Sequence, residues 1–234
     1  MSTLYLIRHA QASFGANDYD VLSELGREQS RVLGRYLAEQ GIILDAVYTG
    51  PRVRQIDTAS LLREAALEAG AQIPEPCQVG ELDEYPAFEL FKKWLPQLAA
   101  DDPQLASALN ASGTERRRLL ERAIAAVSTK WARGELDAGD LETFSSFDQR
   151  VKAGLRSIMN DLGRKKSAAL VTSGGPVSIA MRRALGLAED VTLRVAWVIA
   201  NASVSEFRFR DDDLSLISFN GLPHFPERRL ITYR

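Results

Sequence analysis

The sequence predicts an α/β fold, a three-layer sandwich in which a mainly parallel central sheet is flanked by helices. Short apolar runs typical of buried strands alternate with longer stretches that carry apolar residues on one helical face. Near the end, residues 203–219 show the alternation of a hairpin. Residues from about 85 to 150 contain no convincing strand, and we expect them to form a helical lid insertion within a single domain spanning residues 1–234.

The first third of the chain supplies strands and helices in alternation. Leu4–Ile7 form a short apolar run that stops at Arg8, as a buried parallel strand does. Ser23 is the expected N-cap of the first helix, and Pro74 and Pro76 place the third strand at an edge. The expected elements are a strand over 4–7, a helix from Ser23 to Gly41, a strand over 45–48, a helix over about 53–69 and a strand over 72–79.

The middle of the chain is expected to be helical. Apolar residues at helical spacing predict three helices, and Pro96 is expected to end the first of them. The apolar positions are Phe88, Phe91, Trp94 and Leu95 in the first helix, Leu120, Ile124, Val127 and Trp131 in the second, and Phe147, Val151, Leu155, Ile158 and Leu162 in the third. We expect this insertion to lie over one end of the sheet.

The strand and helix pattern returns after the insertion. Residues 168–172 form the expected fourth strand, and Gly174–Pro176 open a helix whose first turn suits a proline. Alternating residues over 203–210, a turn at Asp211–Asp213 and a returning stretch over 214–219 predict the closing hairpin.

Composition narrows the class of function. A chain of 234 residues can bury a core without disulfides, and a net charge of −2 gives no basic field to attract nucleic acid or an anionic membrane. One cysteine and two histidines, His9 and His224, leave little for a metal centre. Because neither a long apolar run nor a signal-peptide pattern is present, we expect a cytoplasmic protein.

Four groups of polar or glycine residues follow expected strands. Arg8 and His9 come directly after the first strand; a neutral imidazole can attack phosphorus, and a guanidinium can hold phosphoryl oxygens. The other groups are the arginines within residues 48–54, the carboxylates of 81–84 and the glycine-rich turn of 171–176. Each alone has a plain alternative, such as a surface arginine, a solvated acidic loop or a tight turn. Together, at the carboxyl ends of strands, they indicate a phosphate site.

Several motifs also occur in a specific order and spacing. They are Arg8-His9-Ala10, Leu22 to Gly26 followed by Gln29, Arg54 with Thr58-Ala59, Glu84, and the helix entry over residues 146–151. In these motifs the chain resembles, over nearly its whole length, the histidine phosphatase superfamily, in the branch that includes cofactor-dependent phosphoglycerate mutase. Ala10 stands where the Arg-His-Gly signature of that family has its glycine.

The resemblance implies a mechanism and its residues. His9 would attack phosphorus and become a phosphohistidine, while Arg8 and Arg54 would bind the phosphoryl oxygens. Glu84 would protonate the leaving oxygen and then deprotonate the attacking water. The resemblance implies no metal and no cofactor, because the arginines supply the positive charge.

One position departs from the family. Ser173 stands where the family has a second histidine that contacts the phosphoryl group, and the flanking Thr172, Gly174 and Gly175 keep the register. Ser173 and Gly174 are therefore expected to bind phosphate, but serine is shorter and cannot carry charge. Loss of one preorganised donor costs on the order of 10²–10³ in rate, so we expect a slow enzyme or one rebuilt around another donor. For His224, packing is preferred to a replacement role.

Other side chains could supply the missing donor or line the entrance. Gln11, Arg52 and the run Arg116–Arg118 are conceivable donors, although a solvated helix face is the better reading of the run. Gln11 and Phe14 are candidates for the substrate entrance, as is Tyr19; packing is an equal alternative for the aromatic residues.

Three functions remain open at this stage. The preferred one is a phosphomonoester hydrolase that acts on a small phosphorylated substrate through phosphohistidine. The alternatives are a protein that binds phosphorylated ligands or a partner with degenerate catalysis, and a mutase-type phosphotransferase. The acidic stretches of the insertion favour hydrolase over mutase, since a mutase needs a closed basic pocket. The sequence leaves the oligomeric state open, and a homodimer is compatible with it.

Overall fold

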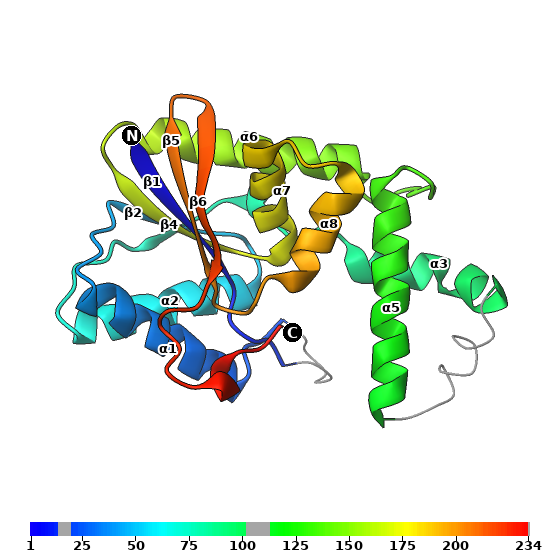
Figure 1. The fold of residues 1–234 in the computed structure, drawn as a ribbon, viewed down its shortest axis with the longest axis horizontal. Coiled ribbons are helices and arrows are strands. Elements are labelled where there is room, and N and C mark those ends of the chain that lie inside the picture. Colours follow the sequence, from blue (N-terminus) through cyan, green and yellow to red (C-terminus); the bar gives the residue numbers. More distant parts are fainter. Residues whose placement is uncertain (14–19, 102–112, 234) are drawn as a thin grey trace.

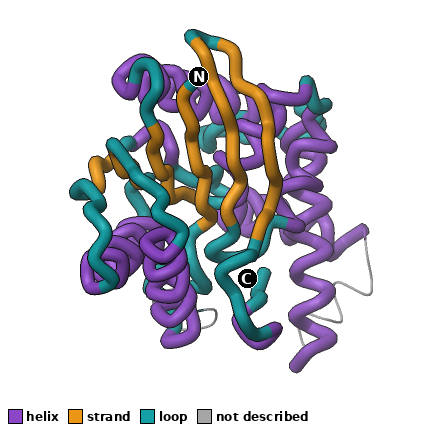
Figure 2. Tube along the Cα trace, turned by 60° about the vertical axis from the view of Figure 1, so that its left-hand side comes forward, coloured by secondary structure: helices purple, strands orange, loops and turns teal. Residues whose placement is uncertain are grey.

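The computed structural model describes residues 1–13, 20–101 and 113–233. It confirms the α/β class, because helices cover both faces of one six-stranded sheet (Figure 1, Figure 2). The strand order is β3-β2-β4-β1-β5-β6. The first four strands are parallel to one another, and the hairpin β5–β6 adds two antiparallel strands beside β1.

The strands lie close to their expected positions. They are β1 Ser2–Arg8, β2 Ala46–Thr49, β3 Pro76–Gln78, β4 Ser167–Thr172, β5 Val204–Arg210 and β6 Asp213–Gly221. β3 is an edge strand, as its prolines predicted, although it is shorter than expected. β1 pairs with β4 on one side and β5 on the other, so the residues after β1 lie near the middle of the sheet's edge.

The described helices are α1 Glu24–Glu39, α2 Val53–Glu68, α3 Ala87–Asp101, α5 Gly113–Ala132, α6 Phe144–Leu162, α7 Gly174–Leu185 and α8 Glu189–Val198, with short 3₁₀ helices η1 Gly80–Leu82 and η2 Arg228–Leu230. Ser23 caps α1 as expected, and its hydroxyl accepts from the Gly26 N–H at 3.0 Å. Helix α8 was not predicted from the sequence. Among the described helices, none combines the length and apolarity needed to cross a membrane.

Alternating side chains of the strands build two cores. Ile7 of β1 packs with Leu33 of α1 and Leu62 of α2 on one face of the sheet. Leu4 and Leu6 contribute instead to the other core, which also contains apolar residues of α3, α5, α6, α7 and α8. The period of two along β1 therefore places α1 and α2 on one face and the remaining helices on the other (Figure 1).

The helix expected to end before Pro96 does not end there. α3 continues through Pro96 to Asp101, so that expectation is wrong. A proline within a helix removes one N–H bond to the carbonyl four residues earlier, here Lys92. Both residues are exposed, so water can satisfy that carbonyl, while Leu90 and Phe91 keep the helix packed on the core.

An aromatic cluster joins the insertion to the sheet layer. The ring of Tyr85 stacks on Trp131 of α5 with centroids 5.1 Å apart, and Trp131 meets Phe144 edge-on at 5.4 Å. Phe147 of α6 packs against both Tyr85 and Trp131. This cluster fixes the chain just beyond Glu84, one of the expected site residues.

Candidate active site

The carboxyl ends of three neighbouring parallel strands bring the expected motifs together. Arg8 is in register with Thr172 across β1 and β4, and Thr49 of β2 is in register with Val171. His9 follows β1 directly, and its N–H donates to the Thr172 carbonyl at 2.7 Å. The motifs after β1, β2 and β4 therefore share one edge of the sheet.

The hydrogen bonds of His9 define its tautomer. Its Nδ1 lies 2.7 Å from the Ala10 carbonyl, which only accepts, and its Nε2 receives the Arg54 Nε–H at 3.1 Å. The proton therefore resides on Nδ1, and Nε2 carries the lone pair. Burial, reinforced by the charges of Arg54 and Arg8, holds the pKa of His9 well below its usual range. The imidazole is thus neutral with an acceptor nitrogen in the site.

Arg54 belongs to the first turn of α2. The residue is only 7% exposed, and Nη1 donates to Asp20 Oδ1 at 2.7 Å while Nε donates to His9. Thr58, one turn later, links this helix to β1, because its hydroxyl accepts from the Ala10 N–H at 3.0 Å. The spacing of Arg54 and Thr58 thus places the arginine against the histidine.

Arg8 contacts the end of the chain. Its Nη1 donates to the carbonyl of Ile199 and, at 2.8 Å, to the carbonyl of Tyr233. The charge of Arg8 also acts on both His9 and Glu84: it helps to lower the pKa of His9, and it partly offsets the rise that burial causes in the pKa of Glu84. The structure therefore brings Arg8, His9, Arg54 and Glu84 into one electrostatic environment.

Glu84 is positioned by two backbone amides. Its Oε2 accepts from the Gly175 N–H at 3.2 Å, at the start of α7, and its Oε1 accepts from the Tyr85 N–H at 3.0 Å. Burial raises the pKa of Glu84 above its usual value, although the Gly175 N–H and the arginines oppose that shift. A Cβ at Gly175 would lie 2.0 Å from Glu84 Oε1, so glycine is needed here for the carboxylate to approach.

Two arginines hold the segment that carries Glu84. Arg150 binds the Glu142 carboxylate with two 2.8 Å bonds and donates to the Glu81 carbonyl at 2.7 Å and the Asp83 carbonyl at 3.2 Å. Arg52, a conceivable phosphate donor, instead binds Asp83 Oδ1 at 2.5 Å.

Ser173 is the N-cap residue of α7 and has no exposed surface. Its hydroxyl accepts a 2.7 Å hydrogen bond from Nε2 of Gln55, which is also fully buried. Gly174 heads α7 and is buried as well. A direct contact of Ser173 or Gly174 with phosphate stays a prediction. Gln55 is a residue that sequence reasoning missed, since no spacing rule connects it to Ser173.

The entrance candidates are only partly described. The side-chain Oε1 of Gln11 accepts from the Ser23 hydroxyl at 2.8 Å, so Gln11 is tied to the cap of α1. Phe14 and Tyr19 lie outside the described residues. Of the run Arg116–Arg118, only the side chain of Arg118 is described, and it is exposed.

His224 packs away from solvent. It is 4% exposed, and the centroid of its ring lies 4.2 Å from that of the Phe225 ring and 5.9 Å from that of the Tyr36 ring. Burial lowers the pKa of His224 to about 4. These ring contacts agree with the packing role preferred from the sequence.

A buried polar network supports the segment after β1. Asn201 Nδ2 donates to the His9 carbonyl at 3.2 Å, and its Oδ1 accepts from the Thr232 hydroxyl at 2.9 Å. Gln29 accepts from the Gln11 N–H at 2.8 Å and donates to both the Leu230 carbonyl and the Thr232 hydroxyl. Asn201 and Thr232 carry no motif that the sequence analysis could have used.

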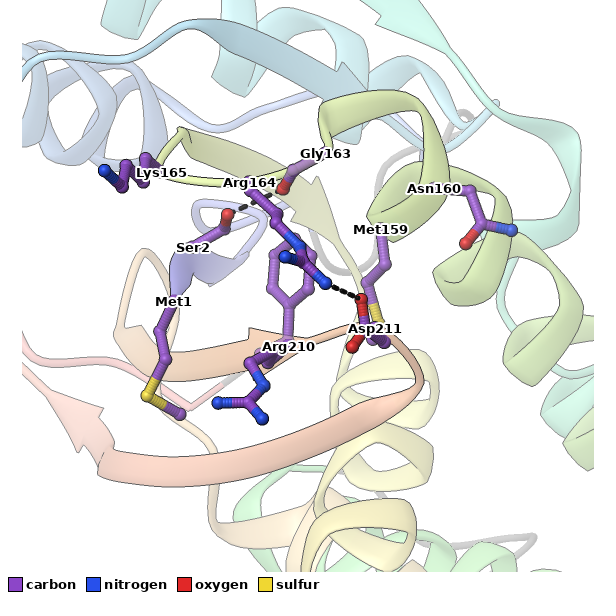
Figure 3. Close-up of a pocket in the computed structure, with 10 residues that line it drawn as sticks. Met1, Ser2, Met159, Asn160, Gly163, Arg164, Lys165, Arg210 and Asp211 are labelled. Atoms are coloured by element: carbon purple, nitrogen blue, oxygen red, sulfur yellow. Dashed lines mark hydrogen bonds and ion pairs between the residues drawn. The ribbon is translucent and has the colours of Figure 1, made fainter.

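A separate cleft opens at the other end of β1. It has a volume of about 580 Å³ and is lined by residues that include Ser2, Gly163 and Arg210 (Figure 3). Within it, Arg164 forms an ion pair with Asp211 at 3.2 Å. Because Ser2 begins β1 and His9 follows its end, this cleft is distinct from the candidate active site.

Comparisons with known proteins agree with this geometry. A family model of the histidine phosphatase superfamily (branch 1) matches residues 4–133 and 112–221. A 2,3-bisphosphoglycerate-dependent phosphoglycerate mutase of Thermobifida fusca (strain YX) is 42% identical over 73 residues, which are 28% of this chain and 29% of that enzyme.

Solved structures share the fold over nearly the whole chain. Bacillus stearothermophilus YhfR aligns with a TM-score of 0.67 at 20% identity, covering 96% of this chain and 99% of that one. A mycobacterial glucosyl-3-phosphoglycerate phosphatase aligns with a TM-score of 0.63 at 18% identity, covering 94% and 99%. The sequence motifs, the shared edge of the sheet and the match of the family model together show that the chain belongs to the histidine phosphatase superfamily.

Proposed function

We propose that the protein is a phosphomonoester hydrolase that forms a phosphohistidine on His9. The observation that carries this proposal is the tautomer of His9, whose buried, neutral ring turns the Nε2 lone pair toward Arg54. A nucleophile for phosphorus needs such a lone pair, and positive charge beside it stabilises the phosphoryl oxygens.

In the first step, the His9 Nε2 lone pair attacks phosphorus and the bond from phosphorus to the ester oxygen breaks. Arg8 and Arg54 bind the phosphoryl oxygens, aided by the amino end of α7 at Ser173 and Gly174. Glu84 gives its proton to the leaving oxygen. The raised pKa of Glu84 supports this role, since it retains a proton to higher pH than an ordinary glutamic acid.

In the second step, water attacks the phosphohistidine. The Glu84 carboxylate formed in the first step accepts a proton from that water, and the bond between phosphorus and Nε2 breaks. Inorganic phosphate leaves, and His9 and Glu84 regain their starting protonation. The proposed steps draw their positive charge from the two arginines and invoke no cofactor.

The substrate proposed is a small phosphorylated molecule. Structures of the Entamoeba histolytica phosphoserine phosphatase, which share this fold, were solved in complex with phosphoserine and with 3-phosphoglyceric acid. The local identity to a phosphoglycerate mutase favours a mutase as the second candidate. Interconversion of glycerate phosphates in the presence of 2,3-bisphosphoglycerate would select the mutase over the hydrolase.

The test of the proposal is capture of the phosphoenzyme. Wild-type protein is mixed with a ³²P-labelled phosphomonoester and quenched in alkali, which preserves phosphohistidine. We expect a base-stable adduct and released phosphate from the wild type, neither from His9→Ala, and both from His224→Gln. The last variant is the matched control, because it removes the other histidine. Absence of both adduct and released phosphate in the wild type would leave a binding protein as the alternative.

A further inference from the structure

Asp20 binds two donors at the edge of the candidate site. Its Oδ1 accepts from Arg54 Nη1 at 2.7 Å, and its Oδ2 accepts from the Val53 N–H at 3.0 Å. Val53 is the first residue of α2, so that N–H belongs to the positive end of the helix. A guanidinium beside helix N–H groups is also what a phosphoryl group would use. Asp20 therefore occupies donors that suit an anionic ligand.

The same arginine lies on the nucleophile. Arg54 Nε is 3.1 Å from His9 Nε2 and donates to its lone pair. For in-line attack, phosphorus must lie along that lone pair at about 3–3.5 Å. The phosphorus atom and Arg54 Nε would then occupy overlapping positions beside His9 Nε2. Attack by His9 thus requires the guanidinium to move off Nε2.

The Asp20 contact opposes that movement. Nη1 and Nε are parts of one planar guanidinium, so a shift that clears His9 Nε2 strains or breaks the bond from Nη1 to Asp20. The Arg54 side chain of this ion pair is 8% exposed and that of Asp20 27%, which weakens screening by water. A ligand must therefore interact with Arg54 more strongly than Asp20 does.

We propose that Asp20 is a specificity-determining residue, an internal carboxylate that holds Arg54 on His9 and that the phosphoryl group must displace. This inference rests on the proposed function, because it takes His9 as the nucleophile. A phosphate dianion carries twice the charge of the carboxylate and offers more acceptor oxygens, so it can displace Asp20 from Arg54. A dianionic phosphoryl group is favoured over a singly charged carboxylate ligand for the same reason.

The experiment measures the binding of inorganic phosphate by isothermal titration calorimetry, for which no turnover is needed. In Asp20→Asn the competing charge is removed while the shape is kept. We expect this variant to bind phosphate at least about tenfold more tightly than the wild type, since the lost contact is a hydrogen bond between charged groups. Asp20→Ser, which also removes the competing charge, is expected to do the same.

Asp45→Asn is the matched control. Asp45 also accepts from one cationic side chain, Lys166 Nζ at 2.7 Å, and one backbone N–H, that of Ser167 at 2.8 Å, but at the opposite end of the sheet. Its phosphate affinity should equal that of the wild type. Thermal unfolding of every variant identifies any that fails to fold.

The results separate this inference from the proposed function. Unchanged or weaker phosphate binding in both folded Asp20 variants would show that Asp20 only positions Arg54, and the inference would be overturned. Absence of both phosphoenzyme and released phosphate, with tighter phosphate binding in the Asp20 variants, would overturn the hydrolase and leave the competition by Asp20 standing.

Discussion

Gln55 donates a 2.7 Å hydrogen bond to the hydroxyl of Ser173, across a separation of 118 residues, and neither side chain has exposed surface. The Gln55 side-chain amide cannot flip freely, because its Oε1 accepts from the Arg52 N–H at 3.0 Å. This bond joins α2, which carries Arg54, to the start of α7, where Gly175 meets Glu84. The pair thus connects the two helices that contribute to the site.

Loss of either partner of this pair should destabilise the protein. Ser173→Ala leaves the buried Gln55 amide without an acceptor, which costs about 1–3 kcal/mol in the free energy of unfolding. Urea denaturation measures this loss. Ser30→Ala serves as a control, because the buried Ser30 hydroxyl bonds to the Gly26 carbonyl of its own helix and its removal should cost less. Equal losses in the two variants would contradict the prediction.

Histidine at position 173 should not fit beside Gln55. We expect Ser173→His to lower the free energy of unfolding by about 1–3 kcal/mol through overpacking, because Ser173 is fully buried. We expect this variant to gain no activity. In the double variant S173H/Q55A, the smaller alanine makes room for the ring. The double variant should unfold at a higher temperature than S173H and hydrolyse p-nitrophenyl phosphate faster. A stable, more active S173H alone would refute this.

The pH dependence of activity should reflect the shifted pKa values of Glu84 and His9. As pH rises through the raised pKa of Glu84, the proton for the leaving oxygen is lost and kcat/KM falls. As pH falls, the neutral form of His9 persists below the usual range of histidine, because its pKa is lowered. Glu84→Gln should abolish the alkaline fall in kcat/KM and slow alkyl phosphates by about 10²–10⁴-fold.

Leaving-group chemistry provides the control for that variant. p-Nitrophenolate departs without a proton, so phosphorylation of E84Q by p-nitrophenyl phosphate should be slowed much less than phosphorylation by an alkyl phosphate. Single-turnover measurements of the phosphoenzyme compare the two substrates. An equal loss for both would mean that Glu84 does not act as the acid.

A methyl group at Gly175 should displace Glu84 from its place. The added Cβ would lie 2.0 Å from the Glu84 Oε1, so the carboxylate must move away from the amino end of α7. We expect Gly175→Ala to lower kcat by on the order of 10²-fold, the range for removal of a positioned acid. Gly80→Ala is the control, because a Cβ there meets nothing within 4 Å. Steady-state kinetics of both variants test this, and a normal kcat in G175A would exclude the close approach.

The parts of the fold and site that could be predicted are those governed by local pattern. Apolar runs and periodicity identified β1 and α2, and their order along the chain placed His9 and Arg54 at one edge of the sheet. The continuation of α3 beyond Pro96 could not be predicted from local pattern, because a proline by itself favours the end of a helix. Here the packing of the flanking turns outweighs one missing hydrogen bond.

Polar contacts between distant segments escaped the sequence reading for a different reason. Asp20 is 34 residues from Arg54, and Asn201 is 192 residues from His9. Neither residue has a distinctive neighbourhood, because another carboxylate could accept from Arg54 and another amide could donate to the His9 carbonyl. Only the three-dimensional arrangement selects the partners, so these residues appear once the backbone is known.

The contact between Arg8 and the Tyr233 carbonyl has a consequence for synthesis on the ribosome. Tyr233 is synthesised 225 residues after Arg8, and the strand β5 beside β1 is also synthesised long after β1. The contact between Arg8 and Tyr233 therefore forms only after the segment that carries Tyr233 has left the exit tunnel. Until β5 has emerged, β1 lacks one neighbour and its edge is open to wrong pairing.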